Sequence, residues 1–272
     1  MTSFARAIAA EFAKIFSTRG WWILAIVLFL YIAALAAGLG ALIGSVDGAS
    51  DAFGTGGAEG GTGLAPLIYS FASSVGYVFP VLLGALAATG EFRHQTLTPT
   101  FLTNPRRGDV LAAKVIALFV IGLLLGAVAL VASVGIGGGV LSLAGIDTAF
   151  DDPDTWALIA RSLLAMGLWA VIGVGLGALV PSQVASIVIV LAFTQFIEPV
   201  LRLAASFADW TETVGQYLPG AASDALVGSS FFTIAGGNAE SLEWWQGGLV
   251  LVAYAAVTAV GGYFVSWKRD VT

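Results

Sequence analysis

Six long apolar runs constrain this chain more than any other feature of its sequence. A membrane-spanning helix needs about 20 mostly apolar residues, and the windows that meet this length are 21–44, 65–89, 110–134, 157–180, 184–206 and 247–267. Only 10% of the 272 residues are charged, whereas a soluble domain carries about a quarter. The sequence therefore predicts an all-α membrane protein with six transmembrane helices, organised as a single membrane domain over residues 1–272.

Glycines predict two local features of these helices. The third window continues apolar beyond residue 134, but the glycines at 135 and 137–139 have low helix propensity and predict a break there. Three Gly-x-x-x-Gly pairs allow helices to approach closely, within one copy of the chain or across a dimer. They are Gly40 and Gly44, Gly122 and Gly126, and Gly173 and Gly177.

Basic residues are concentrated at alternate ends of the windows. They lie before the first window, around the second connection and after the sixth window: Arg6, Lys14, Arg19, Arg93, Arg106, Arg107, Lys114 and Lys268. The connections on the other side carry Asp and Glu but no Lys or Arg. Because positively charged flanks stay in the cytoplasm, the sequence predicts that both termini are cytoplasmic.

Two segments outside the windows also have helical character. In residues 1–20 apolar side chains recur at helical spacing with charged residues between them, which predicts an interfacial amphipathic helix. Residues 207–246 contain a Tyr-Leu-Pro-Gly turn signal at 217–220, followed by an apolar stretch that is too short to span. We expect short re-entrant or interfacial helices in this outer region, with an ordinary folded loop as the alternative.

Several kinds of chemistry are disfavoured by what the sequence lacks. There is no cysteine and His94 is the only histidine, so we expect no metal site. No Gly-x-x-x-x-Gly-Lys-Ser/Thr loop occurs, so the chain cannot bind and hydrolyse ATP by itself through such a loop. We therefore expect no enzyme activity, no bound cofactor and no nucleic-acid partner for this chain.

Residues 90–109 form the longest connection on the predicted cytoplasmic side. Glu91 closes the second window, a Thr-Leu-Thr-Pro-Thr stretch follows at 96–100, and a Pro-Arg-Arg run precedes the third window. Together with the helix at 1–20 and the Tyr-Leu-Pro motif at 217–219, these features resemble the type-2 exporter family of ABC transporter permeases over essentially the whole chain. The family often has Glu-x-x-x-Gly-Thr here, whereas Gln95 stands at the glycine position, which affects the expected turn geometry.

The resemblance implies the membrane-spanning permease subunit of an ATP-binding-cassette exporter, in the plasma (inner) membrane of a bacterium. It implies partner ATPase subunits that bind ATP and Mg²⁺, a second permease copy or a homologue, and membrane lipid. It also implies that residues 1–20 are an elbow helix and that residues 90–109 contact the ATPase. The expected coupling residues are Glu91, Arg93, Gln95, Thr96, Pro99, Arg106 and Arg107. The alternative is that the arginines only determine topology.

Charged residues inside the windows predict a second candidate site. Glu198 and Arg202 are four residues apart, so they share one helical face and can pair. Arg161 in the fourth window falls at a similar level and could join them. Because buried intramembrane charges mark functional sites, the three would form a cluster that lines or gates the substrate path. The alternative is a structural ion pair whose arginines snorkel outward.

Two other classes of function remain open at this point. The chain could be a membrane anchor or assembly subunit that transports nothing, or an ion-coupled secondary transporter. The secondary transporter would favour several intramembrane carboxylates, and only Glu198 is evident in the windows. Short loops and a nearly uncharged interior favour an amphiphilic substrate such as a drug, a lipid or a hydrophobic peptide.

Overall fold

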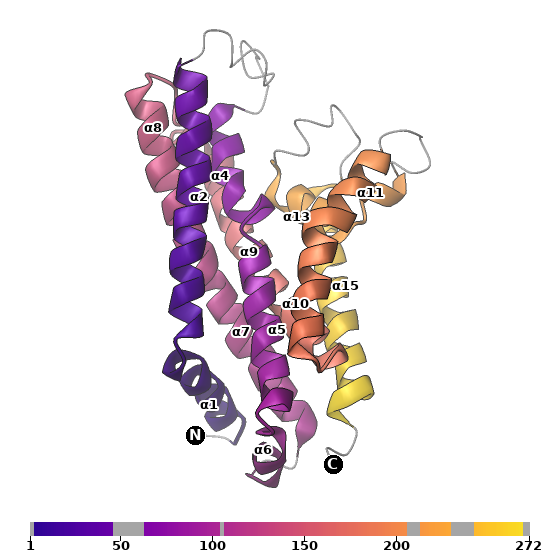
Figure 1. Cartoon of the computed structure of the whole chain (residues 1–272). Helices are drawn as coiled ribbons and strands as arrows, with labels where there is room; N and C mark the ends of the chain where they lie inside the picture. Colours follow the sequence, from indigo (N-terminus) through magenta and orange to yellow (C-terminus); the bar gives the residue numbers. More distant parts are fainter. Residues whose placement is uncertain (1–2, 46–62, 104–105, 206–212, 230–241, 269–272) are drawn as a thin grey trace.

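The computed structural model describes residues 3–45, 63–103, 106–205, 213–229 and 242–268. These residues form helices and turns, with no strand among them. The helical segments that are long and apolar enough to cross a membrane are Gly20–Ser45, Leu64–Arg93, Arg107–Leu143, Pro153–Leu179, Gln183–Ala204 and Trp244–Trp267. The prediction of an all-α, multi-pass membrane protein with six spans is confirmed (Figure 1).

Several of the spans are built from more than one helical element, and η denotes a π-helical stretch. In chain order the spans are α2 (Gly20–Ser45); α4 (Leu64–Ser74) with α5 (Val78–Arg93); α7 (Arg107–Leu130) with η1 (Val131–Gly137) and α8 (Gly138–Leu143); α9 (Pro153–Leu179); α10 (Gln183–Ala192) with η2 (Phe193–Ile197) and α11 (Glu198–Ala205); and α15 (Trp244–Gly262) with η3 (Tyr263–Trp267). Three shorter helices complete the described chain, namely α1 (Ser3–Ser17), α6 (Leu97–Thr103) and α13 (Pro219–Val227).

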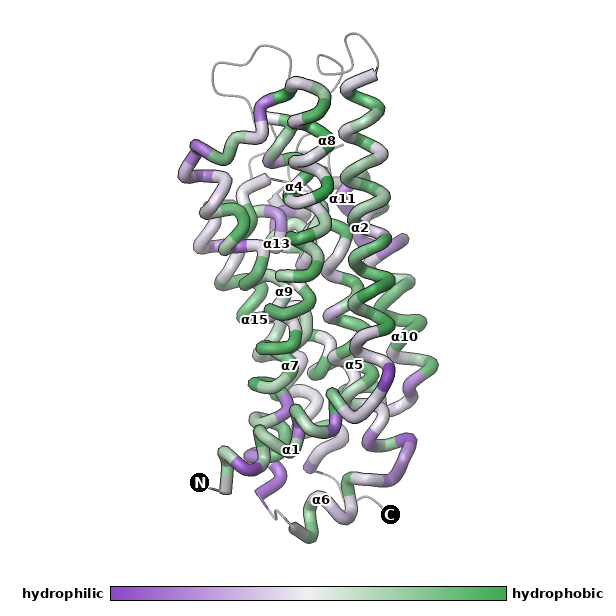
Figure 2. Tube along the Cα trace, turned by 90° about the vertical axis from the view of Figure 1, so that its left-hand side faces the viewer, coloured by the Kyte–Doolittle hydropathy of each residue, from purple (hydrophilic) through white to green (hydrophobic). Residues whose placement is uncertain are grey.

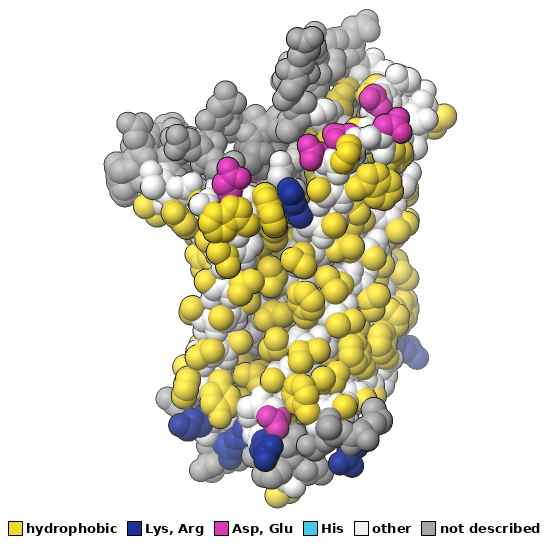
Figure 3. Space-filling model, turned by 180° about the vertical axis from the view of Figure 1, so that it is seen from behind, with side chains coloured by type: hydrophobic (Ala, Val, Ile, Leu, Met, Phe, Trp, Pro, Cys, Tyr) yellow, Lys and Arg dark blue, Asp and Glu magenta, His cyan; other side chains and the backbone are white. Residues whose placement is uncertain are grey.

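The two ends of the helix bundle carry opposite charge. Both chain termini lie at the end that holds α1 and α6 (Figure 1). The tube is hydrophobic along the middle of the bundle and more hydrophilic toward its ends (Figure 2). Most Lys and Arg side chains in Figure 3 gather at the end with the termini, whereas most Asp and Glu gather at the other end. We call these the basic end and the acidic end.

Helix α9 is the central element of the bundle, and it packs against α5, α7 and α15. At the crossing of α9 with α5 the two backbones touch. A Cβ atom added at Gly173 would overlap the carbonyl oxygen of Val81, and one added at Gly84 would overlap the carbonyl oxygen of Ala170. Glycine is therefore required on both helices for this close approach.

The three Gly-x-x-x-Gly pairs named above lie at contacts within this chain. They place Gly40 and Gly44 against Val140 and Ala144, Gly122 and Gly126 against α9 at Met166, and Gly173 and Gly177 against α5. The sequence left open whether these pairs act within one copy or across a dimer. Because each pair already contacts another helix of the same copy, the dimer is not needed to explain them.

The predicted helix break in the third span is wrong. The helix continues through η1 and α8 as far as Leu143. A Cβ atom at Gly137 would overlap Ile68, and one at Gly138 would crowd the hydroxyl of Tyr69. The glycines of span three allow spans one and two to pack closely against it. These tertiary contacts outweigh the low helix propensity of glycine.

Helix α13 fills part of the region where short helices were predicted before the last span. It packs against α9, α15 and α4 at the acidic end (Figure 1), and nearly all of its residues are buried. Proline at its first position and Gly228 after its last residue, with φ +94°, fit the preferences of helix ends. Residues 207–212 and 230–241 of the predicted region lie outside the described residues.

The turn between α5 and α6 places Gln95 in the left-handed region, with φ +54°. The N–H of Thr96 donates to the carbonyl of Glu91 at 3.0 Å, and the N–H of Gln95 donates to the carbonyl of Phe92 at 3.3 Å. These bonds form the Schellman turn that usually has glycine at its left-handed position. The geometry thus explains why glycine would be favoured where this chain has Gln95.

Replacing Gln95 with glycine should stabilise the protein by about 1 kcal/mol, because the left-handed conformation is strained for a residue with a Cβ. Replacing Gln95 with alanine keeps the Cβ and should give no gain. The measurement is the unfolding midpoint of the purified protein in detergent. Equal stability of the two variants would show that the turn is not strained.

Candidate functional site

Helix α6 is clamped onto the basic end of the bundle by aromatic contacts. The ring of Trp267, in η3, is fully buried and meets the ring of Phe92 edge-on at 5.6 Å. Phe101 of α6 meets the same ring at 6.3 Å. Leu97, the first residue of α6, is also fully buried. The helix is therefore fixed to the ends of the second and sixth spans.

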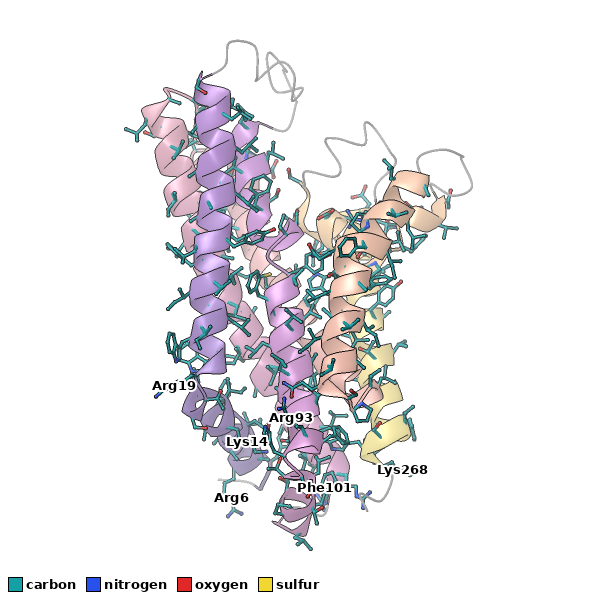
Figure 4. All side chains as sticks on the ribbon, viewed as in Figure 1. Arg6, Lys14, Arg19, Arg93, Phe101 and Lys268 are labelled. Atoms are coloured by element: carbon teal, nitrogen blue, oxygen red, sulfur yellow. The ribbon has the colours of Figure 1, made fainter. Side chains whose placement is uncertain are left out.

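Two of the predicted coupling arginines tie neighbouring segments together. The guanidinium of Arg107 donates to the carbonyl of Lys268 at 2.8 Å and lies over the ring of Phe101, 5.0 Å from its centroid. Arg93 donates to the side-chain oxygen of Gln183 at 2.7 Å. Arg93, Phe101 and Lys268 all lie toward the basic end of the bundle in Figure 4. These contacts link α6 and its flanks to the third, fifth and sixth spans.

The outward side of α6 is open to the surroundings. Thr98 and Pro99 are exposed, and Leu102 is 81% exposed. The side chain of Arg106 is also largely exposed and lies 4.0 Å from Asp109. Residues 104 and 105 of the predicted coupling segment lie outside the described residues. The described part of the segment thus presents both apolar and basic side chains to the surroundings.

Glu91 has different surroundings from the other predicted coupling residues. It is 5% exposed and belongs to a cluster with Glu11, Lys14 and Lys114, which we call the basic-end ion cluster. The Lys14 ammonium lies 2.6 Å from Glu11 and 2.8 Å from Glu91, and the Lys114 ammonium lies 2.9 Å from Glu91 and also bonds Glu11. The cluster joins α1, α5 and α7, and its two carboxylates balance its two ammonium groups.

The basic-end ion cluster also changes the interpretation of α1. This helix is amphipathic as predicted, with Ile15 buried and the ring of Phe16 against Trp21 at 5.1 Å. Its polar residues Glu11 and Lys14, however, point toward α5 and α7 rather than away from the protein. From the sequence, Lys114 was expected to mark the cytoplasmic side, and no buried ion pair was predicted for it. Its position one turn inside an apolar window was the signal for a buried partner.

The pKa of Lys14 is shifted by this cluster. Burial disfavours the charged ammonium, but the carboxylates of Glu91 and Glu11 outweigh burial and raise the pKa above its ordinary value of 10.5. A raised pKa in the folded state means that the stabilisation from Lys14 is fully present below pH 10.5 and is lost only as the pH rises through the folded-state pKa. Lys14 therefore stays charged at neutral pH.

A second cluster lies near the acidic end and contains Glu198, Arg202 and Asp224, which we call the acidic-end ion cluster. The guanidinium of Arg202 lies 2.6 Å from Asp224 and 3.4 Å from Glu198. Ser74 donates to the other oxygen of Asp224 at 3.1 Å. The backbone N–H of Gly220, at the start of α13, donates to Glu198. The cluster thus joins the second and fifth spans to α13.

The structure brings together two of the three residues that were predicted to cluster here. The guanidinium of Arg161 lies over the ring of Trp244, 4.7 Å from its centroid. Among the described residues no ion pair joins Arg161 to Glu198. Asp224 is the third member of the cluster. In the sequence it is one of the Asp and Glu residues of the outer connections. Its isolation within an apolar stretch was the signal that it could be buried.

A cavity of about 170 Å³ adjoins the acidic-end ion cluster. Irregular helix segments surround it: the break between α4 and α5, the π-helical stretch η2, and the start of α13. Its described lining residues are Ser74, Val75, Tyr77, Thr194, Gln195, Glu198, Pro199, Arg202, Gly220, Ser223 and Asp224. Backbone irregularity at membrane depth is tolerated where it is buried in protein or lines a cavity, so the position of these breaks fits a cavity.

Aromatic packing supports the wall of this cavity. Tyr77 stacks on Trp169 with ring centroids 4.4 Å apart, and its hydroxyl donates to the carbonyl of Thr194 at 3.3 Å. Trp169 donates its indole N–H to Ser223 at 3.0 Å. Trp169 is thus part of the buried packing behind the cavity.

The arrangement therefore offers two polar regions, one at each end of the bundle. At the basic end an exposed short helix is fastened to several spans, and at the acidic end buried charges border a small cavity. No known-family model matches this sequence, and no curated protein is significantly similar to it.

Proposed function

We propose that this chain is the membrane-spanning permease subunit of an ATP-binding-cassette exporter for an amphiphilic substrate. Separate ATPase subunits would supply the work, and a second copy or a homologue would complete the path. The observation that carries the proposal is α6, a short helix that is fastened to the bundle and exposed on its outward side. The sequence resemblance to type-2 exporter permeases supports the same conclusion.

The contacts of α6 suit a part that passes movement from a partner into the membrane. A displacement of α6 would reach α5 through the turn at Gln95 and α7 through Arg107. It would reach η3 through Trp267. Helices α5, α7 and α15, to which these contacts lead, all pack against α9. An ATPase that pushed on this one helix would thus act on four of the spans.

The proposed orientation places the basic end in the cytoplasm, where nucleotide-binding subunits work. The separation of basic and acidic side chains along the bundle supports this (Figure 3). Most of the predicted coupling residues are exposed, namely Arg93, Gln95, Thr96, Pro99 and Arg106. The buried Glu91 would instead act by holding α5 to α1 and α7.

A photo-crosslinking amino acid placed at Leu102 should capture the ATPase, because Leu102 is the most exposed apolar side chain of α6. The matched control is Leu143, which is 91% exposed at the opposite end of the bundle. The expected product at Leu102 is a subunit with a Gly-x-x-x-x-Gly-Lys-Ser/Thr loop, identified by mass spectrometry, with no such product at Leu143. Capture of that subunit at Leu143 alone would reverse the orientation.

An ion-coupled secondary transporter is the second candidate, and one observation favours it. The acidic-end ion cluster holds two buried carboxylates, Glu198 and Asp224, where the sequence windows suggested one. Glu198 lies in the fifth span and Asp224 in the adjacent helix α13, and carboxylates inside spans are typical of ion and proton pathways. Uptake or release of substrate by vesicles with an ion gradient and no ATP would support this second candidate over the exporter.

A further inference from the structure

The acidic-end ion cluster has an excess of negative charge. Its described residues carry two carboxylates and one guanidinium, and Glu198 is only 2% exposed. One oxygen of Glu198 accepts from the Gly220 N–H and faces Arg202. The other oxygen, Oε2, is buried and has no hydrogen-bond partner among the described residues. A buried carboxylate oxygen without a partner is costly, so it calls for a positive ligand.

The space for such a ligand is the adjoining cavity, which Glu198 lines. Its volume of about 170 Å³ is close to the roughly 150 Å³ of an engineered apolar cavity that binds benzene. Unlike that cavity, this one has polar walls, because Ser74, Thr194 and Gln195 border it. The volume of the cavity thus fits a compact organic molecule, and its polar lining residues favour a molecule that carries a polar group.

The chemistry of the walls favours an organic cation over a metal ion. Among the described residues no group of three His, Asp or Glu could hold a metal ion. Tyr77 supplies an aromatic wall, and aromatic faces attract cations. An ammonium group offers hydrogen-bond donors, which is what the free oxygen of Glu198 requires.

We propose that this cavity binds a compact organic cation whose primary ammonium group bonds to Glu198 Oε2. The proposed binding site lies within this chain, where the second span, the fifth span and α13 meet. The inference concerns binding by this chain alone, so it does not rest on the proposed function.

The test compares two ligands that differ mainly in charge, cyclopentylammonium and cyclopentanol. Their binding to the purified full chain in detergent is measured by titration calorimetry at pH 7. We expect the ammonium to bind at one site at least tenfold more tightly than the alcohol. This comparison uses the unaltered protein, so it does not depend on the folding of a variant.

The Glu198→Gln variant keeps the shape of the side chain and removes its charge. It should weaken binding of cyclopentylammonium to the level of cyclopentanol, whereas Asp151→Asn, at an exposed acid outside the cavity lining, should not. Equal binding of the two ligands to the unaltered protein, or no binding of either, would overturn the inference. So would an infrared band of a protonated carboxyl group that disappears in Glu198→Gln, because a proton would then supply the missing charge.

Discussion

Replacing Lys114 with methionine should lower the free energy of unfolding by about 3–5 kcal/mol, the usual cost of leaving a buried charge without its partner. Lys114 is 2% exposed and bonds both Glu11 and Glu91. Its removal leaves these two carboxylates with Lys14 alone, so the basic-end ion cluster gains a net negative charge. The measurement is equilibrium unfolding in detergent, with Arg6→Met as the control, because Arg6 is exposed on the same end of the protein.

Adding a second substitution to Lys114→Met separates the effect of the unbalanced charge from the effect of lost packing. In the Glu11→Gln, Lys114→Met double variant the remaining charges, Glu91 and Lys14, balance and keep their 2.8 Å contact. The double variant should therefore be more stable than Lys114→Met alone. If Lys114→Met were as stable as Arg6→Met, the basic-end ion cluster would not hold α1 to the bundle.

Replacing Gly173 with alanine should destabilise the protein by about 3 kcal/mol, near the upper end of the usual cost of overpacking. The added Cβ would overlap the backbone of Val81, and a backbone atom cannot move aside as a side chain can. Spans two and four would have to separate. The loss should be visible as a lower unfolding midpoint in detergent.

The control for this change is Gly139→Ala, in α8. A Cβ atom at Gly139 meets nothing within 4 Å. Alanine favours helix over glycine by up to about 1 kcal/mol, so this variant should be as stable as the original or slightly more so. Equal destabilisation by the two substitutions would mean that the close contact of α5 with α9 does not limit stability.

Much of the fold could be predicted from the sequence, because a span of apolar residues has few other options in a membrane. The spans, α1 and a short helix before the last span follow from length, hydropathy and turn signals. The predicted break in the third span failed for a physical reason. Gly137 has a low helix propensity by itself, but its contacts with Ile68 and Ala36 decide the conformation, and those contacts are not visible in sequence.

The candidate sites could be predicted only in part. Glu198 and Arg202 pair as their spacing suggested, because four residues on one helix fix their distance. The remaining partners come from distant segments: Asp224 in α13, and Glu11 and Lys114 around Glu91. Which buried charges meet depends on how the helices pack. Arg161 shows the same limit, since its neighbour Trp244 is on another span.

The proposal that this chain works with a separate ATPase is tested most directly by isolating it from its native membrane. The chain lacks a Gly-x-x-x-x-Gly-Lys-Ser/Thr loop, so any ATP hydrolysis through such a loop must come from a partner. The account predicts that the tagged chain, solubilised in mild detergent, co-purifies with a subunit that carries this loop, and that the complex hydrolyses ATP. Purification with no nucleotide-binding subunit and no ATP hydrolysis would contradict it.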